Sequence, residues 1–135
     1  ETDPYLQQDD LVAACKEMGV AVTAYSPLGS PDSAAMMGRE DDVLLTENPT
    51  IVRIAEARGA TPGQVLISWA LHRGTSVIPK SVNPGRIVEN LGAEDVALSP
   101  DDMRAIAALD RNARFVDGRF WFLGETYSAH SLWDE

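Results

Sequence analysis

The 135-residue chain is 44% hydrophobic and 24% charged, a composition typical of one globular domain and not of a disordered or collagen-like chain. Its 21 acidic and 11 basic residues give a net charge of −10, which argues against nucleic acid or an anionic membrane as a partner. The single cysteine excludes an internal disulfide, and no apolar run approaches the ~20 residues of a membrane span, so we expect a cytoplasmic protein.

The first third of the chain predicts one helix, one strand and a long loop. Residues 5–19 carry apolar side chains at helical spacing, and we expect one of them, Cys15, to pack in the core. The β-branched and apolar residues 20–25 predict a buried strand, and SPLGSP at 26–31 predicts a turn. Residues 32–47 have little periodicity and predict a long loop, which is typical of a functional segment in a compact domain.

Four helix starts then share one design, a capping residue followed by proline at the first helical position. They are Asn48-Pro49, Thr61-Pro62, Asn83-Pro84 and Ser99-Pro100. They predict helices over 49–58, 62–73, 84–91 and 100–109, and the apolar residues 76–79 between two of them predict a second strand. Strands alternating with helices indicate a parallel α/β fold, although two strands alone close neither a doubly wound sheet nor a barrel.

Several residue types that often form functional sites lack the spacing that such sites need. His72 and His130 have no second histidine or cysteine at metal-ligand spacing, and the acidic run 40–42 does not follow the pattern of a calcium loop. The chain has no glycine-rich dinucleotide or phosphate-loop motif. We therefore expect no metal site, with His72 at the surface or capping a helix end.

Stronger signals follow the two predicted strands. In parallel α/β folds the functional residues lie at the carboxyl ends of the strands, here residues 24–30 and 78–90. Lys80 precedes a helix start and Arg86 lies in its first turn, where free backbone N–H groups are expected. Together they predict a phosphate site on an otherwise acidic protein; the alternative is that both are ordinary surface charges.

Three segments carry a resemblance to a known family. They are ExxPYLxQxxLxxxCxxxG at 1–19, VTAYSPLGSPD at 22–32 and TPGQVLISWALHRGTSVIPKSVNPGRIVENL at 61–91. In this order and spacing the sequence resembles the C-terminal part of an aldo-keto reductase, from residue 1 to about residue 110, and the tail at 117–135 is similar to fungal members. The resemblance implies a (β/α)8 TIM barrel, of which residues 1–135 supply the C-terminal part with two strands and flanking helices, and 111–135 a variable tail that forms the substrate loop.

The resemblance also implies an NADP(H) site. Tyr25 would stack on the nicotinamide, while Lys80 and Arg86 would hold the 2′-phosphate, which favours NADP(H) over NAD(H). The residues implied for the pyrophosphate and for the loop that covers it are Ser26, Leu28, Ser30 and Asp32. The residues implied beside the adenosine are Ser81, Val82, Asn83, Glu89 and Asn90.

The activity implied is NADPH-dependent reduction of aldehydes, ketones or sugars to alcohols, with a small carbonyl compound as the partner and Trp121, between Phe120 and Phe122, as a candidate substrate wall. None of the family's catalytic Asp, Tyr, Lys and His residues maps onto this chain, which begins with Glu and not Met. We therefore expect an excerpted or processed chain that is inactive and unstable alone, and that depends on the missing N-terminal half of a monomeric enzyme. The alternative is a truncated or regulatory nucleotide-binding fragment without turnover.

Overall fold

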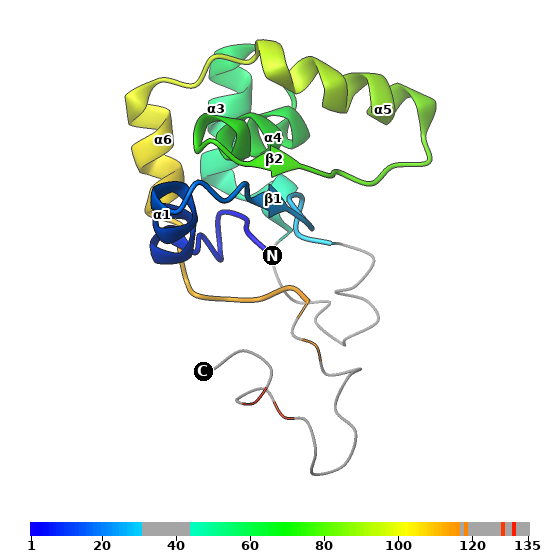
Figure 1. The fold of residues 1–135 in the computed structure, drawn as a ribbon. Coiled ribbons are helices and arrows are strands. Elements are labelled where there is room, and N and C mark those ends of the chain that lie inside the picture. Colours follow the sequence, from blue (N-terminus) through cyan, green and yellow to red (C-terminus); the bar gives the residue numbers. More distant parts are fainter. Residues whose placement is uncertain (31–43, 117, 119–127, 129–130, 132–135) are drawn as a thin grey trace.

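The fold is a pair of short parallel strands covered by helices (Figure 1). The computed structural model describes residues 1–30, 44–116, 118, 128 and 131. The elements in chain order are α1 (Asp9–Glu17), β1 (Thr23–Ala24), η1 (Leu45–Glu47), α3 (Pro49–Arg58), α4 (Pro62–His72), β2 (Ser76–Val77), α5 (Pro84–Leu91), η2 (Gly92–Asp95) and α6 (Pro100–Ala107). In Figure 1, α3 and α4 lie above the strands, α1 and α6 lie to their left, and α5 extends at the upper right.

The two strands pair as predicted for a parallel α/β fold, with Thr23 opposite Ser76 and Ala24 opposite Val77. Both are shorter than the predicted ranges 20–25 and 76–79. The prediction that the first strand is buried is wrong except at Ala24, which is 0% exposed while Val20 is 51% exposed. A strand is buried on both faces only where elements cover both. Within the described residues each strand has one strand neighbour, and the sheet has two strands.

All four predicted helix starts are confirmed. Asn48 accepts a hydrogen bond from the Thr50 backbone N–H, and Thr61 and Ser99 each begin a complete capping box. These contacts matter because the first N–H groups of a helix have no partner within it. The helices begin where predicted, and α4 and α6 end one and two residues earlier than predicted.

The first helix differs most from its prediction. It begins at Asp9 rather than residue 5, and none of its residues is buried. Cys15 is partly exposed, so its expected place in the core is wrong. The buried residues lie just before the helix. There Asp3 and Leu6 form a tight turn and exchange two backbone hydrogen bonds, of 3.1 and 3.0 Å. The apolar stripe of α1 faces no described element closely enough to be buried, so periodicity alone placed Cys15 wrongly.

The core forms around α4, whose residues 65–70 are all buried. Trp69 is its largest fully buried side chain, and the surrounding side chains come from α3, η1, α6 and the loop before α1. The end of the predicted long loop belongs to this core, because Leu45 of η1 is 0% exposed. Residues 31–43, which make up most of that loop, lie outside the described residues.

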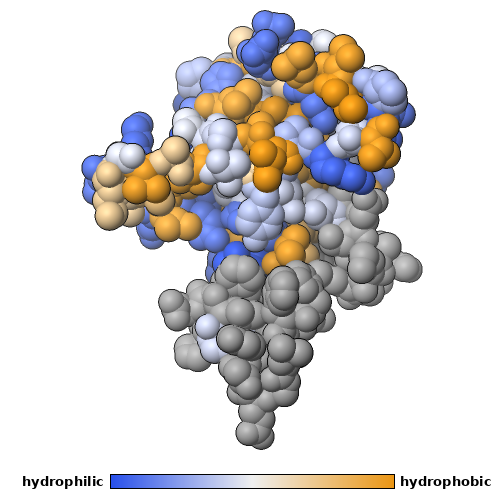
Figure 2. Space-filling model, turned by 45° about the vertical axis from the view of Figure 1, so that its right-hand side comes forward, coloured by the Kyte–Doolittle hydropathy of each residue, from blue (hydrophilic) through white to orange (hydrophobic). Residues whose placement is uncertain are grey.

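Apolar side chains also remain at the surface, and Figure 2 shows several orange patches on one side of the molecule. On α5, Ile87, Val88 and Leu91 are 52%, 71% and 71% exposed. Their spacing of three and four residues places them on one helix face. No helix in the described part of the chain is long and apolar enough to cross a membrane.

Candidate functional site

Two segments that carry the predicted site residues leave the sheet side by side. Tyr25–Ser30 follows β1 and Ile78–Asn83 follows β2, and the Ile78 N–H donates to the Ala24 carbonyl at 3.2 Å. Because the strands are parallel, both carboxyl ends lie at one edge of the sheet. The structure therefore brings the two groups of predicted residues to the same edge.

The segment after β1 is a tight turn in an uncommon backbone conformation. Ser26, Gly29 and Ser30 have φ angles of 53°, 80° and 43°, in the left-handed region that non-glycine residues rarely adopt. The turn is closed by a bond from the Gly29 N–H to the Ser26 carbonyl at 2.9 Å and by a 2.8 Å hydrogen bond between the two serine hydroxyls. A backbone held this way at a strand end is a candidate binding loop.

The turn rests directly on the core. A Cβ atom on Gly29 would lie 3.1 Å from Leu45 Cδ1 and 3.1 Å from both Cε2 and Cζ of Phe115. Any larger residue would force the core or the turn to shift. Glycine is therefore favoured here by space as well as by its φ angle.

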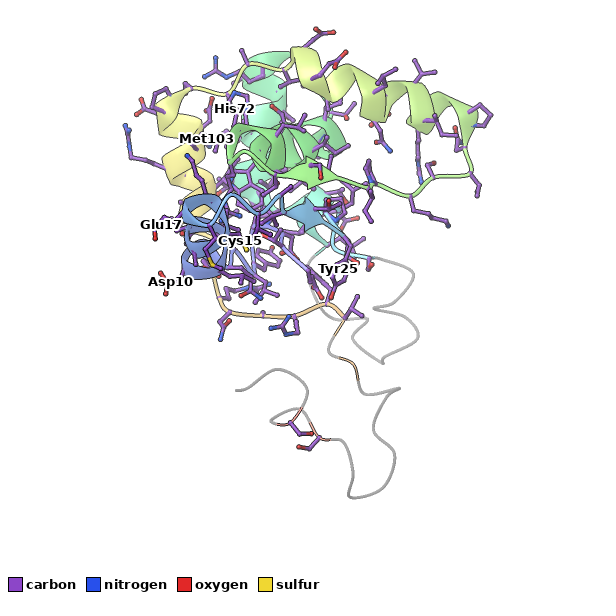
Figure 3. The ribbon with its side chains drawn as sticks, viewed as in Figure 1. Asp10, Cys15, Glu17, Tyr25, His72 and Met103 are labelled. Carbon is purple, nitrogen blue, oxygen red and sulfur yellow. The ribbon has the colours of Figure 1, made fainter. Side chains whose placement is uncertain are left out.

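Tyr25 lies half-buried at the start of this turn, at the carboxyl end of β1 (Figure 3). Burial raises the pKa of Tyr25, and the nearby charge of Glu1 raises that pKa further while Arg114 lowers it. The phenol therefore stays neutral at physiological pH. A neutral, half-exposed aromatic ring can stack on a flat heterocycle.

The segment after β2 carries the predicted cations, and Lys80 and Arg86 are both exposed. The expectation of free N–H groups at the start of α5 is wrong, because the Asn83 side chain accepts hydrogen bonds from the Gly85 and Arg86 backbones at 2.9 and 3.2 Å. A short amide at the capping position satisfies these donors locally. An anion at this helix start would rely on the cationic side chains and on hydroxyls such as that of Ser81.

Arg86, Glu89 and Asn90 share one face of α5 by their spacing. Glu89 already has a partner, since its carboxylate accepts a 2.7 Å hydrogen bond from the Thr61 hydroxyl, while its backbone carbonyl accepts one from Gln64. This places the predicted adenine-binding face of α5 beside the capping box of α4. Asn90 is half-buried on the same face.

The remaining predictions lie partly outside the described residues. Asp32 and Trp121, with its neighbours Phe120 and Phe122, are not described. No group of three or more histidine, cysteine or acidic residues in the described segments is arranged to hold a metal ion. His72 is exposed, as expected, and its Nδ1 lies 2.9 Å from the Ser68 carbonyl.

Two residues that were not predicted as site residues border this site. The Glu1 carboxylate accepts hydrogen bonds from the backbone N–H groups of Phe115 and Val116, at 2.6 and 2.9 Å. The Phe115 ring is 3% exposed and contacts the turn at Gly29. No local pattern could have indicated this contact, since Glu1 and Phe115 are 114 positions apart.

Helices that cover a pair of parallel strands joined by crossover connections define the class of parallel α/β proteins. The model of the Aldo/keto reductase family matches residues 1–111. The chain belongs to the aldo/keto reductase family.

Individual relatives agree. The chain is 46% identical over 136 residues to Aldo/keto reductase slr0942 of Synechocystis, an alignment that covers all of this chain and 42% of that protein. It is 46% identical over 116 residues to Aldo-keto reductase family 1 member A1 of Bos taurus, covering 86% of this chain and 35% of that protein.

Among solved structures, MGS-M4, an aldo-keto reductase enzyme from a Medee basin deep-sea metagenome library, superposes with a TM-score of 0.73 at 32% identity. The superposition covers 84% of this chain and 39% of that one. The chain therefore spans well under half the length of each of these relatives.

Proposed function

We propose that this chain supplies the cofactor-binding side of an NADP(H)-dependent oxidoreductase that reduces aldehydes, ketones or sugars to alcohols. The observation that carries the proposal is the parallel pairing of β1 with β2, which brings the Tyr25 turn and the Lys80 segment to one edge of the sheet. Family membership agrees with this chemistry. Bound NADPH would supply the hydride that reduces the carbonyl carbon.

The described residues fit such a ligand at both of its ends. At the nicotinamide end, the neutral ring of Tyr25 would orient a flat heterocycle by stacking, and the hydroxyls of Ser26 and Ser30 would reach the pyrophosphate. At the other end, Lys80 and Arg86 would hold the 2′-phosphate through charge-assisted hydrogen bonds. Ser81, Val82 and Asn83 would border the same phosphate.

The proposal includes the rest of the barrel. The chain would form the seventh and eighth strands of a (β/α)8 barrel, and further strand–helix units would cover its open strand edges and the exposed apolar face of α5. Its acid–base residues would come from those units, since none of the family's catalytic residues maps onto this chain. Residues 111–135 would then form the variable substrate loop, with Trp121 as a wall.

The test compares two cofactors in the native protein that contains this chain. Replacing Arg86 with alanine should weaken NADPH binding by about 1.5–3 kcal/mol, the range for charge-assisted hydrogen bonds, and NADH binding much less. The matched control is Arg53→Ala, which removes an exposed arginine of α3 and should leave both affinities unchanged. Equal losses for the two cofactors would overturn the 2′-phosphate assignment.

A second measurement separates an enzyme from a non-catalytic nucleotide-binding protein. Aldehyde-dependent oxidation of NADPH, followed by its absorbance, is expected from the native protein. NADPH binding without any carbonyl reduction would favour the non-catalytic alternative.

A further inference from the structure

The start of the C-terminal tail, residues 111–116, is held against the beginning of the chain by hydrogen bonds and one cation–π contact. The Tyr5 carbonyl accepts hydrogen bonds from the backbones of Arg111 and Ala113 at 3.1 and 3.0 Å, and the Arg111 guanidinium lies 3.6 Å from the centroid of the Tyr5 ring. Two and three residues beyond Ala113, the Phe115 and Val116 N–H groups donate to the two carboxylate oxygens of Glu1. This segment has no helix or strand of its own, so these contacts set its position.

The same segment also contacts the turn after β1, residues 26–30. The Phe115 ring stacks on Tyr5 with centroids 5.9 Å apart, and two of its atoms would lie only 3.1 Å from a methyl group added at Gly29. The charge of Glu1 raises the pKa of Tyr25 and that of Arg114 lowers it. The tail start and the turn are thus in contact at Gly29.

Close packing makes such a contact transmit displacement. Protein interiors have few voids, so the turn at Gly29 cannot move toward the core without moving Phe115. A ligand that reduces the fluctuations of the turn would also reduce those of the ring packed on it. The backbone N–H of Phe115, held by Glu1, would report this restriction directly.

From these contacts we propose that Phe115 and Glu1 are positioning residues that couple the 26–30 turn to the tail start, so that a dinucleotide phosphate bound at the turn fixes where the tail leaves the core. Phe115 transmits the position of the turn through its ring. Glu1 holds the backbone of Phe115 and Val116 in place by accepting hydrogen bonds from their two N–H groups. The inference rests on the proposed function, because it takes the phosphates of NADP(H) as the ligand of the turn.

The test measures backbone amide hydrogen exchange at Phe115 and Val116 in the native protein, with and without NADPH, while fluorescence quenching records NADPH binding in the same samples. We expect NADPH to slow exchange at both amides by about fivefold or more, the lower end of typical coupling between sites. The amide of Val52, which is bonded to Asn48 at the start of α3, serves as the internal reference and should not respond.

Two variants test the separate roles of Phe115 and Glu1. Phe115→Leu keeps an apolar side chain but lacks the ring edge that meets Gly29, so NADPH should still bind while its effect on the two amides is lost. Glu1→Gln replaces one acceptor oxygen with an N–H donor, so exchange at the two amides should be faster both with and without NADPH. Glu56→Gln, at an exposed position of α3, is the matched control for charge removal and should behave like the unaltered protein.

Each outcome decides one point. NADPH binding with unchanged exchange at Phe115 and Val116 would overturn the coupling and leave the proposed function standing. A slowing of exchange that persists in Phe115→Leu would overturn the role of the ring. Absence of NADPH binding would overturn the proposed function and this inference with it.

Discussion

Arg58 donates two hydrogen bonds, of 2.8 and 2.5 Å, to one carboxylate oxygen of Asp102, which is 44 positions away in the chain. The contact joins the last residue of α3 to the first turn of α6. The same carboxylate accepts the Ser99 N–H of the capping box at 2.9 Å. Burial alone would raise the pKa of Asp102, but the hydrogen bonds from Ser99 and Arg58 outweigh it and hold that pKa below its usual value.

Removing this pair should destabilise the fold by a modest amount. The Arg58 side chain is 35% exposed, so we expect Arg58→Ala to lower the free energy of unfolding by about 1 kcal/mol, as measured by urea denaturation. Arg104→Ala breaks the pair with Asp101, in which both side chains are more than two-thirds exposed, and should cost less than about 0.5 kcal/mol. Equal costs would mean that the Arg58 contact contributes no more than a surface pair.

The same pair has a defined pH dependence. Because the folded-state pKa of Asp102 lies below the unfolded value of about 3.9, its stabilisation is fully present above that value. It is lost as the pH falls through the folded pKa. The stability difference between the unaltered protein and Arg58→Ala should therefore be constant from pH 5 to 8 and shrink below pH about 4. A difference that grows in acid would contradict this assignment.

Asp3 should give the opposite pH dependence. It is 0% exposed, and burial raises its pKa to about 7, while one carboxylate oxygen has no hydrogen-bond partner. Since the folded pKa exceeds the unfolded value, ionised Asp3 costs stability, and the cost grows from pH about 4 to about 7. Asp3→Asn keeps the acceptor for the Tyr5 N–H and removes the charge. Its stability advantage in urea titrations should rise across that window and level off above it; a constant difference would refute the shifted pKa.

Gly29→Ala tests the contact between the turn and the core. Gly29 and Gly59 have similar positive φ angles, but a Cβ on Gly59 would have nothing within 4 Å. We expect Gly59→Ala to cost about 1 kcal/mol from backbone strain alone, and Gly29→Ala about 1–3 kcal/mol more from overpacking against Phe115. Thermal denaturation of both variants measures the difference. Similar losses of stability in the two variants would show that the Phe115 ring can move aside at little cost in free energy.

Thr61 should contribute through two hydrogen bonds at once, because its hydroxyl accepts the Gln64 N–H and donates to Glu89. Thr61→Val keeps the shape of the side chain and removes both bonds, at a cost of about 1–2 kcal/mol. Thr61→Ser retains the hydroxyl and should recover most of that loss in the same unfolding measurement. A serine variant as unstable as the valine variant would assign the effect to packing.

The sequence was most informative where structure is local. A capping side chain followed by proline acts within four residues, and all four helix starts lie where this pattern placed them. Burial depends on which elements lie nearby, and periodicity could not show that Cys15 lies on a helix with no buried residue. The donors at the start of α5 are not free, because Asn83 caps the helix at the place where the phosphate site was predicted.

The candidate site, too, could be predicted from the sequence only in part. The motifs around Tyr25 and Lys80 indicated that two strand ends carry function, and the parallel register brings them to one edge. Glu1 begins the first family-like segment, but no pattern links it to Phe115, because their contact joins distant parts of the chain. Physical reasoning on a single sequence has no signal for such a pair.

The hydrogen bonds from Glu1 to residues 115 and 116, and from Gln7 to the carbonyls of residues 106 and 107, span 99 to 115 positions. Such contacts raise the contact order, so the chain must close a very long loop before they form. On the ribosome, the buried segment 2–7 would have its partners at Asn48 and Arg73 first, and its complete set only after residue 116 has emerged from the exit tunnel. Until then the Tyr5 ring would lack its stacking partner Phe115 and remain partly uncovered in the nascent chain, where a chaperone could bind it.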